Sequence, residues 1–349
     1  GGRTGIHLGA GGTVINNKNV SGIQYGINSS NLNTLVTNNA GGDITGGDYG
    51  IRLVVGGKVE NYNTITGGPT GAGIYTNEPT SLVENFAGTI SGGRGILHAR
   101  GGNVNNDGII IGTGAGAGTD GDGIAVFTGT SVVRNNNKIT GSTHGVNLSA
   151  GGKVYNDGGI ITGGTESGVR ANGANSLVEN ILQGEITGGR HGVVLNAGGA
   201  VINDHKITGG TGSGVLSEGS AADVYNTGDI EASTGIRLNA GGSVDNSGTI
   251  TGINYQGIVV QSGLGKIYNN FPGVIDGNTD GISLGADGEI ENNFEITGGN
   301  IGIRLVAGGL VTNYANSVIT GSGTAANHGG IYAEGGLSTI ENFGMMVLF

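Results

Sequence analysis

The sequence predicts an all-β fold, a right-handed parallel β-helix solenoid of about 15 coils, each of about 23 residues and three short strands. Two repeating patterns predict it. A Gly-Ile or Gly-Val pair recurs in 15 copies from Gly5 to Gly330. An Asn follows each glycine 11 or 12 residues later, two residues after a Val or Ile. A propeller blade needs roughly twice this length, and the Leu-x-x-Leu-x-Leu signature of leucine-rich repeats is absent.

The coil over residues 50–68 shows how each strand is predicted. Ile51 and Leu53 alternate with a polar residue in the first strand, Val59 stands two residues before Asn61 in the second, and an Ile-Thr-Gly segment forms the third. Such alternation between turns rich in Gly and Asn is typical of short strands with one buried face. Coils stacked about 4.8 Å apart place the apolar residues in inward rows. Parallel crossover connections favour the right-handed sense.

The recurring asparagine predicts an internal ladder. Because it lies two residues after an inward Val or Ile, its side chain points inward as well. A buried amide must be hydrogen-bonded, and identical amides in successive coils can bond to one another. We therefore expect a structural role for all 15 copies, which are Asn16, Asn38, Asn61, Asn85, Asn106, Asn135, Asn156, Asn180, Asn203, Asn226, Asn246, Asn269, Asn292, Asn313 and Asn342.

Composition narrows the function classes. Glycine supplies 80 of the 349 residues, but a Gly-x-y period is missing, which argues against collagen. The net charge of −11 argues against nucleic acid as a partner, because that partner needs a basic surface. No apolar stretch of about 18 residues is present, so no helical membrane span is expected in this segment. The chain has no cysteine. We expect residues 1–349 to form a single solenoid that is a segment of a longer chain.

The outward positions of the second strand hold the candidate contact surface. Glu60 and Glu84 occupy this position in successive coils, and Tyr155, Tyr225 and Tyr268 occupy it further along. A carboxylate pair one coil apart resembles the spacing in a retaining glycosidase, and tyrosines can stack on sugars. Solvated acids and packing between coils are the alternative interpretation. We predict no catalytic residues and no cofactor.

The third turn of the coil is the edge where the repeat varies most in length. It is long from Gly112 to Asp122 and from Gly321 to Gly329, and such insertions mark either a functional edge or tolerated surface loops. Asp120 and Asp122 resemble a calcium loop in part only, since the EF-hand spacing is not completed. We therefore predict no metal ligands.

Two runs carry a resemblance to a known family. GIRLNAGGSVDNSGTITG (Gly235–Gly252) and GVNLSAGGKVYNDGGIITGG (Gly145–Gly164) resemble the passenger domains of Gram-negative autotransporters. The resemblance implies a pectin-lyase-like right-handed β-helix of the adhesin type. It also implies secretion, display at the surface of a Gram-negative bacterium, adhesion, self-association and a role in biofilm.

These observations favour an extracellular structural or adhesive rod that is not an enzyme and mediates self-association, filament formation or surface attachment. Its expected partners are further copies of itself, end to end or side by side, and glycans or cell surfaces. Neither the first nor the last copy departs from the repeat, which favours end-to-end stacking or a longer native chain. The alternatives are a carbohydrate-active enzyme on the same scaffold, either a polysaccharide lyase or a hydrolase, or a phage tail-fibre shaft.

Overall fold

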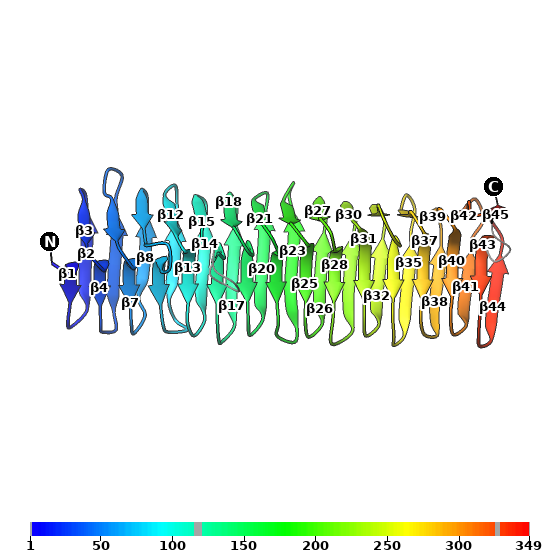
Figure 1. Cartoon of the computed structure of the whole chain (residues 1–349), viewed down its shortest axis with the longest axis horizontal. Helices are drawn as coiled ribbons and strands as arrows, with labels where there is room; N and C mark the ends of the chain where they lie inside the picture. The colour runs from blue at the N-terminus through cyan, green and yellow to red at the C-terminus, as the bar shows by residue number, and fades with distance from the viewer. Residues whose placement is uncertain (1, 115–120, 325–328, 349) are drawn as a thin grey trace. The chain divides into compact units, whose positions relative to one another are not determined.

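The computed structural model describes residues 2–114, 121–324 and 329–348. The chain divides into two compact units, Gly1–Gly173 and Ala174–Phe349, and each is a parallel β-solenoid (Figure 1). Each coil contributes one strand to each of three parallel sheets, and the described residues contain no helix. The predicted fold class is thereby confirmed, with about 15 coils of about 23 residues over the chain. The right-handed sense of the coil stays a prediction.

The first unit builds its three sheets from strands β1 to β22. The first sheet holds β1 (Thr4–Leu8), β4 (Tyr25–Ser29), β7 (Tyr49–Leu53), β10 (Ala72–Thr76), β13 (Arg94–His98), β16 (Ile124–Val126), β19 (Val146–Leu148) and β22 (Ser167–Ala171). The second holds β2 (Gly12–Asn16), β5 (Thr34–Asn38), β8 (Lys58–Asn61), β11 (Leu82–Asn85), β14 (Gly102–Asn106), β17 (Ser131–Asn135) and β20 (Gly152–Asp157). The third holds β3 (Val20–Gly22), β6 (Ile44–Gly46), β9 (Thr64–Thr66), β12 (Thr89–Gly92), β15 (Ile109–Gly112), β18 (Lys138–Gly141) and β21 (Ile160–Gly163).

The second unit repeats this arrangement with strands β23 to β45. Its first sheet holds β25 (His191–Leu195), β28 (Ser213–Ser217), β31 (Thr234–Leu238), β34 (Ile258–Val260), β37 (Asp280–Leu284), β40 (Ile301–Leu305) and β43 (Gly329–Ala333). Its second holds β23 (Ser176–Ile181), β26 (Gly199–Asn203), β29 (Ala222–Asn226), β32 (Gly242–Asn246), β35 (Gly265–Asn269), β38 (Gly288–Asn292), β41 (Gly309–Asn313) and β44 (Ser338–Asn342). Its third holds β24 (Glu185–Gly188), β27 (Lys206–Gly209), β30 (Asp229–Ala232), β33 (Thr249–Gly252), β36 (Val274–Gly277), β39 (Glu295–Gly298), β42 (Val318–Gly321) and β45 (Met345–Leu348).

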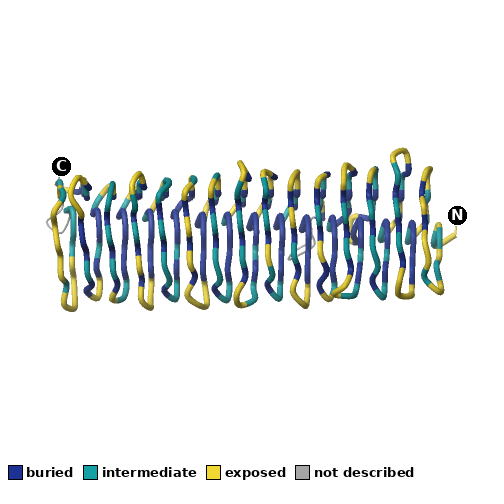
Figure 2. The backbone as a smooth tube through the Cα atoms, turned by 180° about the vertical axis from the view of Figure 1, so that it is seen from behind, coloured by how far each residue is buried: buried dark blue, intermediate teal, exposed yellow. Residues whose placement is uncertain are grey.

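Strand register keeps equivalent residues in line from coil to coil. In the first unit Ile51 pairs with Ile74, and Val59 pairs with Val83. Because side chains alternate across a strand, this register keeps each of these rows on one face of its sheet. The Ile, Val and Leu of these rows are almost fully buried in the middle of each unit, whereas the turns are largely exposed (Figure 2).

Two features of the backbone geometry require glycine in the repeat, a close contact between coils and positive φ angles in a turn. A Cβ on Gly95, a glycine of the Gly-Ile pair, would clash with Ile110 Cγ2 and would lie 2.5 Å from the carbonyl oxygen of Gly123 in the next coil. This close approach excludes any side chain. In the Ala-Gly-Gly turn, Gly151 and Gly152 have φ angles of 81° and 144°. Such positive values favour glycine, which explains the paired glycines before many second strands.

Candidate functional site

The recurring asparagines form the predicted internal ladder. In the first unit each Nδ2 donates to the Oδ1 of the asparagine in the next coil, at 2.8 or 2.9 Å along the steps from Asn16 to Asn156. In the second unit the same bonds run from Asn180 to Asn342. All of these side chains are buried except Asn342, which is exposed. The inward amides link successive coils, so the side chains that remain available for contacts are those at the outward positions.

The outer row of the second sheet lies between the buried Val or Ile and the ladder asparagine. In the first unit the strand register places Glu60, Glu84, Asn105, Arg134 and Tyr155 in successive coils. Three residues of the predicted contact surface, Glu60, Glu84 and Tyr155, therefore belong to one row. Asn105 and Arg134 stand between them and were not singled out from the sequence, although their position in the repeat places them there.

Lys58 links the two carboxylates of this row. Its Nζ lies 2.8 Å from Glu60 Oε1 and 2.7 Å from Glu84 Oε2. Thr37 also donates to Glu60 Oε2 at 3.1 Å. The hydrogen bond from Lys58 lowers the pKa of Glu60, and the two carboxylates raise the pKa of Lys58. A retaining glycosidase needs one carboxyl group that stays protonated near neutral pH. The ammonium group of Lys58 favours the ionised form of Glu60 instead.

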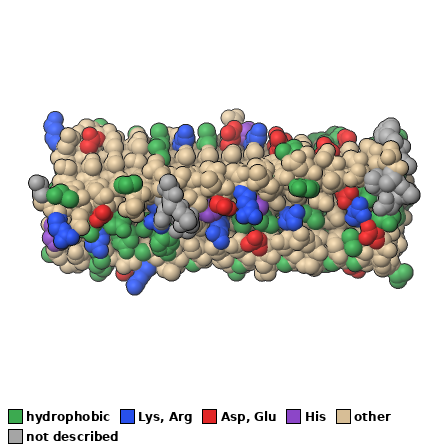
Figure 3. All heavy atoms as spheres, in the orientation of Figure 1, with side chains coloured by type: hydrophobic (Ala, Val, Ile, Leu, Met, Phe, Trp, Pro, Cys, Tyr) green, Lys and Arg blue, Asp and Glu red, His purple; other side chains and the backbone are tan. Residues whose placement is uncertain are grey.

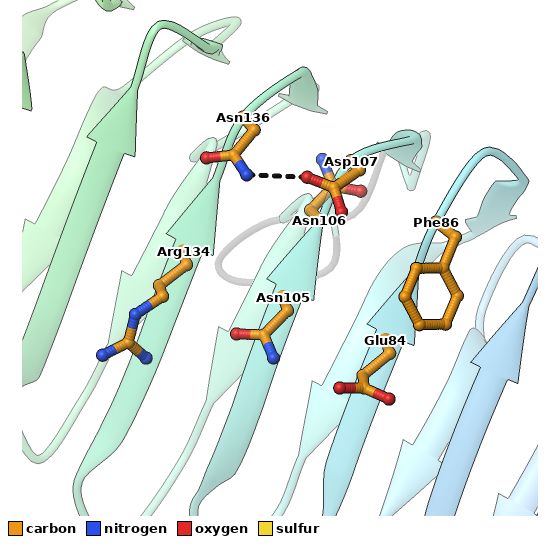
Figure 4. Close-up of a pocket in the computed structure, with 7 residues that line it drawn as sticks. All are labelled: Glu84, Phe86, Asn105, Asn106, Asp107, Arg134 and Asn136. Carbon is orange, nitrogen blue, oxygen red and sulfur yellow. Dashed lines mark hydrogen bonds between the residues drawn. The ribbon is translucent and has the colours of Figure 1, made fainter. Parts of the chain in front are cut away.

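Beside this row the surface forms a depression of about 390 Å³. Its lining comes from three coils and comprises Glu84, Phe86, Asn105, Asn106, Asp107, Arg134 and Asn136 (Figure 4). The side chains of Glu84, Asn105 and Arg134 project from β11, β14 and β17, while Phe86, Asp107 and Asn136 lie in the turns that follow these strands. Asn136 Nδ2 donates to Asp107 Oδ1 at 2.7 Å. An aromatic ring, amides and charged groups thus converge on one hollow.

The residues at both ends of the depression, Phe86 and Arg134, each pack against an aromatic ring of a neighbouring coil. The rings of Phe86 and Tyr62 stack with centroids 4.8 Å apart and planes 15° from parallel. At the other end, the Arg134 guanidinium lies over the ring of Tyr155, 5.0 Å from its centroid. Tyr155 therefore takes part in packing between coils, one of the two roles considered from the sequence.

In the second unit the outer row contains the two remaining tyrosines of the predicted surface. Tyr225 pairs in register with Asp245, and Asp245 pairs with Tyr268. An acidic residue therefore separates the two rings. Tyr225 is exposed over 47% of its surface, and Tyr268 is half-buried. Tyr268 is followed in the row by Glu291. This row alternates aromatic and acidic groups.

The outer face of the first sheet carries an aromatic cluster that sequence reasoning missed. Tyr49 stacks against Tyr25 with centroids 6.0 Å apart, and its ring packs at a tilt of 40° against Tyr75, with centroids 5.1 Å apart. The Arg52 guanidinium lies over the rings of Tyr25 and Tyr75. Next to them Leu97 is only 4% exposed, although the alternation within its strand points it outward. Tyr25 and Tyr49, which each precede a Gly-Ile pair, were the available signal, because register pairs them in successive coils.

A buried polar cluster lies further along this face. Asp122 accepts hydrogen bonds from the backbone N–H of His144 at 3.2 Å and from Asn147 Nδ2 at 3.0 Å. His144 Nδ1 in turn accepts the backbone N–H of Ser167 at 3.2 Å. Burial raises the pKa of Asp122 to about 7 and lowers the pKa of His144 to about 4. The Asp122 carboxylate contacts a backbone N–H and an amide side chain, and it does not contact the His144 imidazole. Asp122, His144 and Ser167 therefore do not form a catalytic triad.

The described part of the chain offers neither a metal centre nor a helical membrane span. No group of three or more His, Cys, Asp or Glu side chains there could hold a metal ion. Asp120, the partner of Asp122 in the partial calcium motif, lies outside the described residues. None of the described segments is a helix long and apolar enough to cross a membrane. On the face drawn in Figure 3, acidic and basic side chains are interspersed among uncharged groups.

Comparison with known proteins adds no relative. No family model, no curated protein and no solved structure matches the chain.

Proposed function

We propose that the chain is an extracellular structural or adhesive β-solenoid whose outward rows make its contacts. The observation that carries the proposal is the regular stacking of coils within each unit, in which the inward positions hold apolar rows and the asparagine ladder. A scaffold of this kind presents the same outward positions at every coil. Repeated contacts of modest strength then add up over many coils, as in other multivalent binders.

The outer row of the second sheet is the contact surface that we favour. In the first unit it combines the linked Glu60 and Glu84 carboxylates with Arg134 and the depression beside Phe86. The ammonium group of Lys58 between the two carboxylates argues against the glycosidase alternative, since it pairs with both acids and favours the ionised form of Glu60. We therefore assign this surface to binding and not to catalysis. Display at a Gram-negative surface, by the autotransporter route, is part of the same proposal.

Adhesion and self-association are tested together on the purified chain. Light scattering at rising protein concentration measures self-association, and beads coated with the chain measure attachment to bacterial and host-cell surfaces. We expect at least one of the two, and we expect the charge reversal Arg134→Glu to weaken it more than the matched reversal Lys153→Glu, in the same sheet outside the depression. A chain that stays monomeric and attaches to nothing would contradict the proposal.

Catalysis is tested separately with polysaccharides. Pectin, alginate and neutral glucans are incubated with the chain, and reducing ends and unsaturated products are measured. We expect no release. Turnover that Glu60→Gln or Glu84→Gln abolishes would replace the adhesive proposal with the enzyme alternative.

A further inference from the structure

We propose that the depression between β11 and β17 binds a neutral saccharide. This inference rests on the proposed function, because it names the ligand class of that contact surface. The depression is built by three successive coils, which supply Glu84 and Phe86, then Asn105 and Asp107, then Arg134 and Asn136 (Figure 4). A ligand lying along the row of these coils would contact all three.

Phe86 supplies an apolar wall. Tyr62 stacks on one face of its ring, nearly parallel, and Tyr62 belongs to the preceding coil. The other ring face is therefore turned toward the next coil, where the depression lies, and the side chain remains 37% exposed. Binding sites for small ligands typically combine such an aromatic surface with a few well-placed polar groups. The C–H face of a pyranose ring fits an aromatic wall of this kind.

The polar groups in the depression have unused hydrogen-bonding capacity. Glu84 Oε2 is bound by Lys58, while no partner of Glu84 Oε1 is found among the described residues. Among the residues that the structure describes, the Asn105 side-chain amide has no hydrogen-bond partner. Within the same residues, the Arg134 guanidinium lies over the ring of Tyr155 but pairs with no acidic side chain. Together they offer a carboxylate acceptor, an amide that both donates and accepts, and a guanidinium donor. A saccharide hydroxyl both donates and accepts, so it can use each of them.

Charge favours a neutral ligand over an acidic one. Two acidic residues, Glu84 and Asp107, line the depression. Their negative charge is balanced by Arg134 in the lining and by Lys58, which pairs with both Glu84 and Glu60. No excess of positive charge is present to attract a polyanion, and the whole chain carries a net charge of −11. A neutral sugar avoids this repulsion and still uses the polar groups of the lining. The Asp107–Asn136 hydrogen bond keeps the turn side of the depression in place.

The inference is tested by titrating the whole chain with tetrasaccharides of matched length. The neutral probes are β-1,4-linked glucose, α-1,4-linked glucose and β-1,4-linked N-acetylglucosamine, and the acidic probe is tetragalacturonate. Calorimetry and saturation-transfer NMR measure binding. We expect at least one neutral probe to bind and the acidic probe to bind at least tenfold more weakly. Phe86→Ala should weaken the neutral probe by about tenfold, on the scale of one aromatic contact, and Asn105→Ala and Arg134→Ala should weaken it as well.

Phe127→Ala is the matched control. Phe127 has a similar exposed fraction, 39%, and follows β16 in the first sheet, outside the lining of the depression. Circular dichroism checks that each variant keeps its fold. The inference is overturned if no neutral probe binds, if tetragalacturonate binds as tightly, or if the control variant weakens binding as much as Phe86→Ala. Loss of saccharide binding with retained adhesion would overturn this inference alone, whereas loss of adhesion and self-association would contradict the proposed function.

Discussion

Replacing one ladder asparagine in the middle of the first unit is the sharpest test of what holds the coils together. Asn106 donates to Asn135 Oδ1 at 2.8 Å, to the Gly108 carbonyl at 3.0 Å and to the Lys138 carbonyl at 3.2 Å. Its own Oδ1 accepts from Asn85 Nδ2 at 2.8 Å. Asn106 is 1% exposed, so water does not replace these bonds freely in the folded chain.

The cost of Asn106→Ala follows from the partners it leaves behind. Asn85 Nδ2 keeps the Ile109 carbonyl as an acceptor at 3.3 Å. Asn135 Oδ1 loses its bond from Asn106, whereas the Gly108 carbonyl keeps the bond from the Lys138 backbone N–H at 3.2 Å. Each buried polar group without a partner costs about 1–3 kcal/mol. One such group, Asn135 Oδ1, gives a destabilisation of about 1–3 kcal/mol, which is a substantial part of the stability of an ordinary domain.

Thermal unfolding and hydrogen exchange measure the effect. Because a solenoid is stabilised mainly by contacts between neighbouring coils, we expect the lost protection to centre on β11, β14 and β17. Asn136→Ala is the control, since Asn136 is exposed, and it should change the free energy of unfolding by less than about 0.5 kcal/mol. If Asn106→Ala were no more destabilising than Asn136→Ala, the ladder would not be what holds the coils together.

Three further predictions concern the close coil contact, the buried carboxyl group and the linked acids. Gly95→Ala should destabilise the first unit strongly, because the added Cβ meets backbone 2.5 Å away, and an unchanged melting temperature would contradict this. Burial raises the pKa of Asp122 to about 7 from 3.8, so the folded state keeps a proton that the unfolded state has released. Stability should therefore fall by up to about 4 kcal/mol as the pH rises from about 4 to 7, and Asp122→Asn should remove that fall in a melting series; an equal pH dependence in both proteins would refute it. Lys58→Met should raise the pKa of Glu60, measured by NMR titration, and no change would refute the lysine as its cause.

Much of the fold could be predicted from the repeat. Register places each residue beside its equivalent in the next coil, so residues at the same position of successive repeats form one row in the structure. For this reason the inward Ile51 and Val59 rows and the ladder through Asn61 were predictable. The same logic predicted that Glu60 and Glu84 are neighbours.

Burial on the outer face of the first sheet could not be predicted in this way. Alternation alone places Leu97 outward and exposed, yet neighbouring side chains on that face cover it. The contact of Asp122 with Asn147 likewise joins two positions that differ within the repeat. Such contacts depend on turn conformation and side-chain rotamers, which vary from coil to coil.

The candidate site likewise has features that the sequence predicted and features that depend on the tertiary structure. The sequence by itself determined the row that contains Glu84, Arg134 and Tyr155, because strand periodicity and coil length set that row. Only the tertiary structure decided that Lys58 reaches both acids and that Phe86 stacks on Tyr62 beside a depression. The physical reason is that hydrogen bonds between coils impose backbone register, whereas long side chains and turns choose among several conformations according to their neighbours in space.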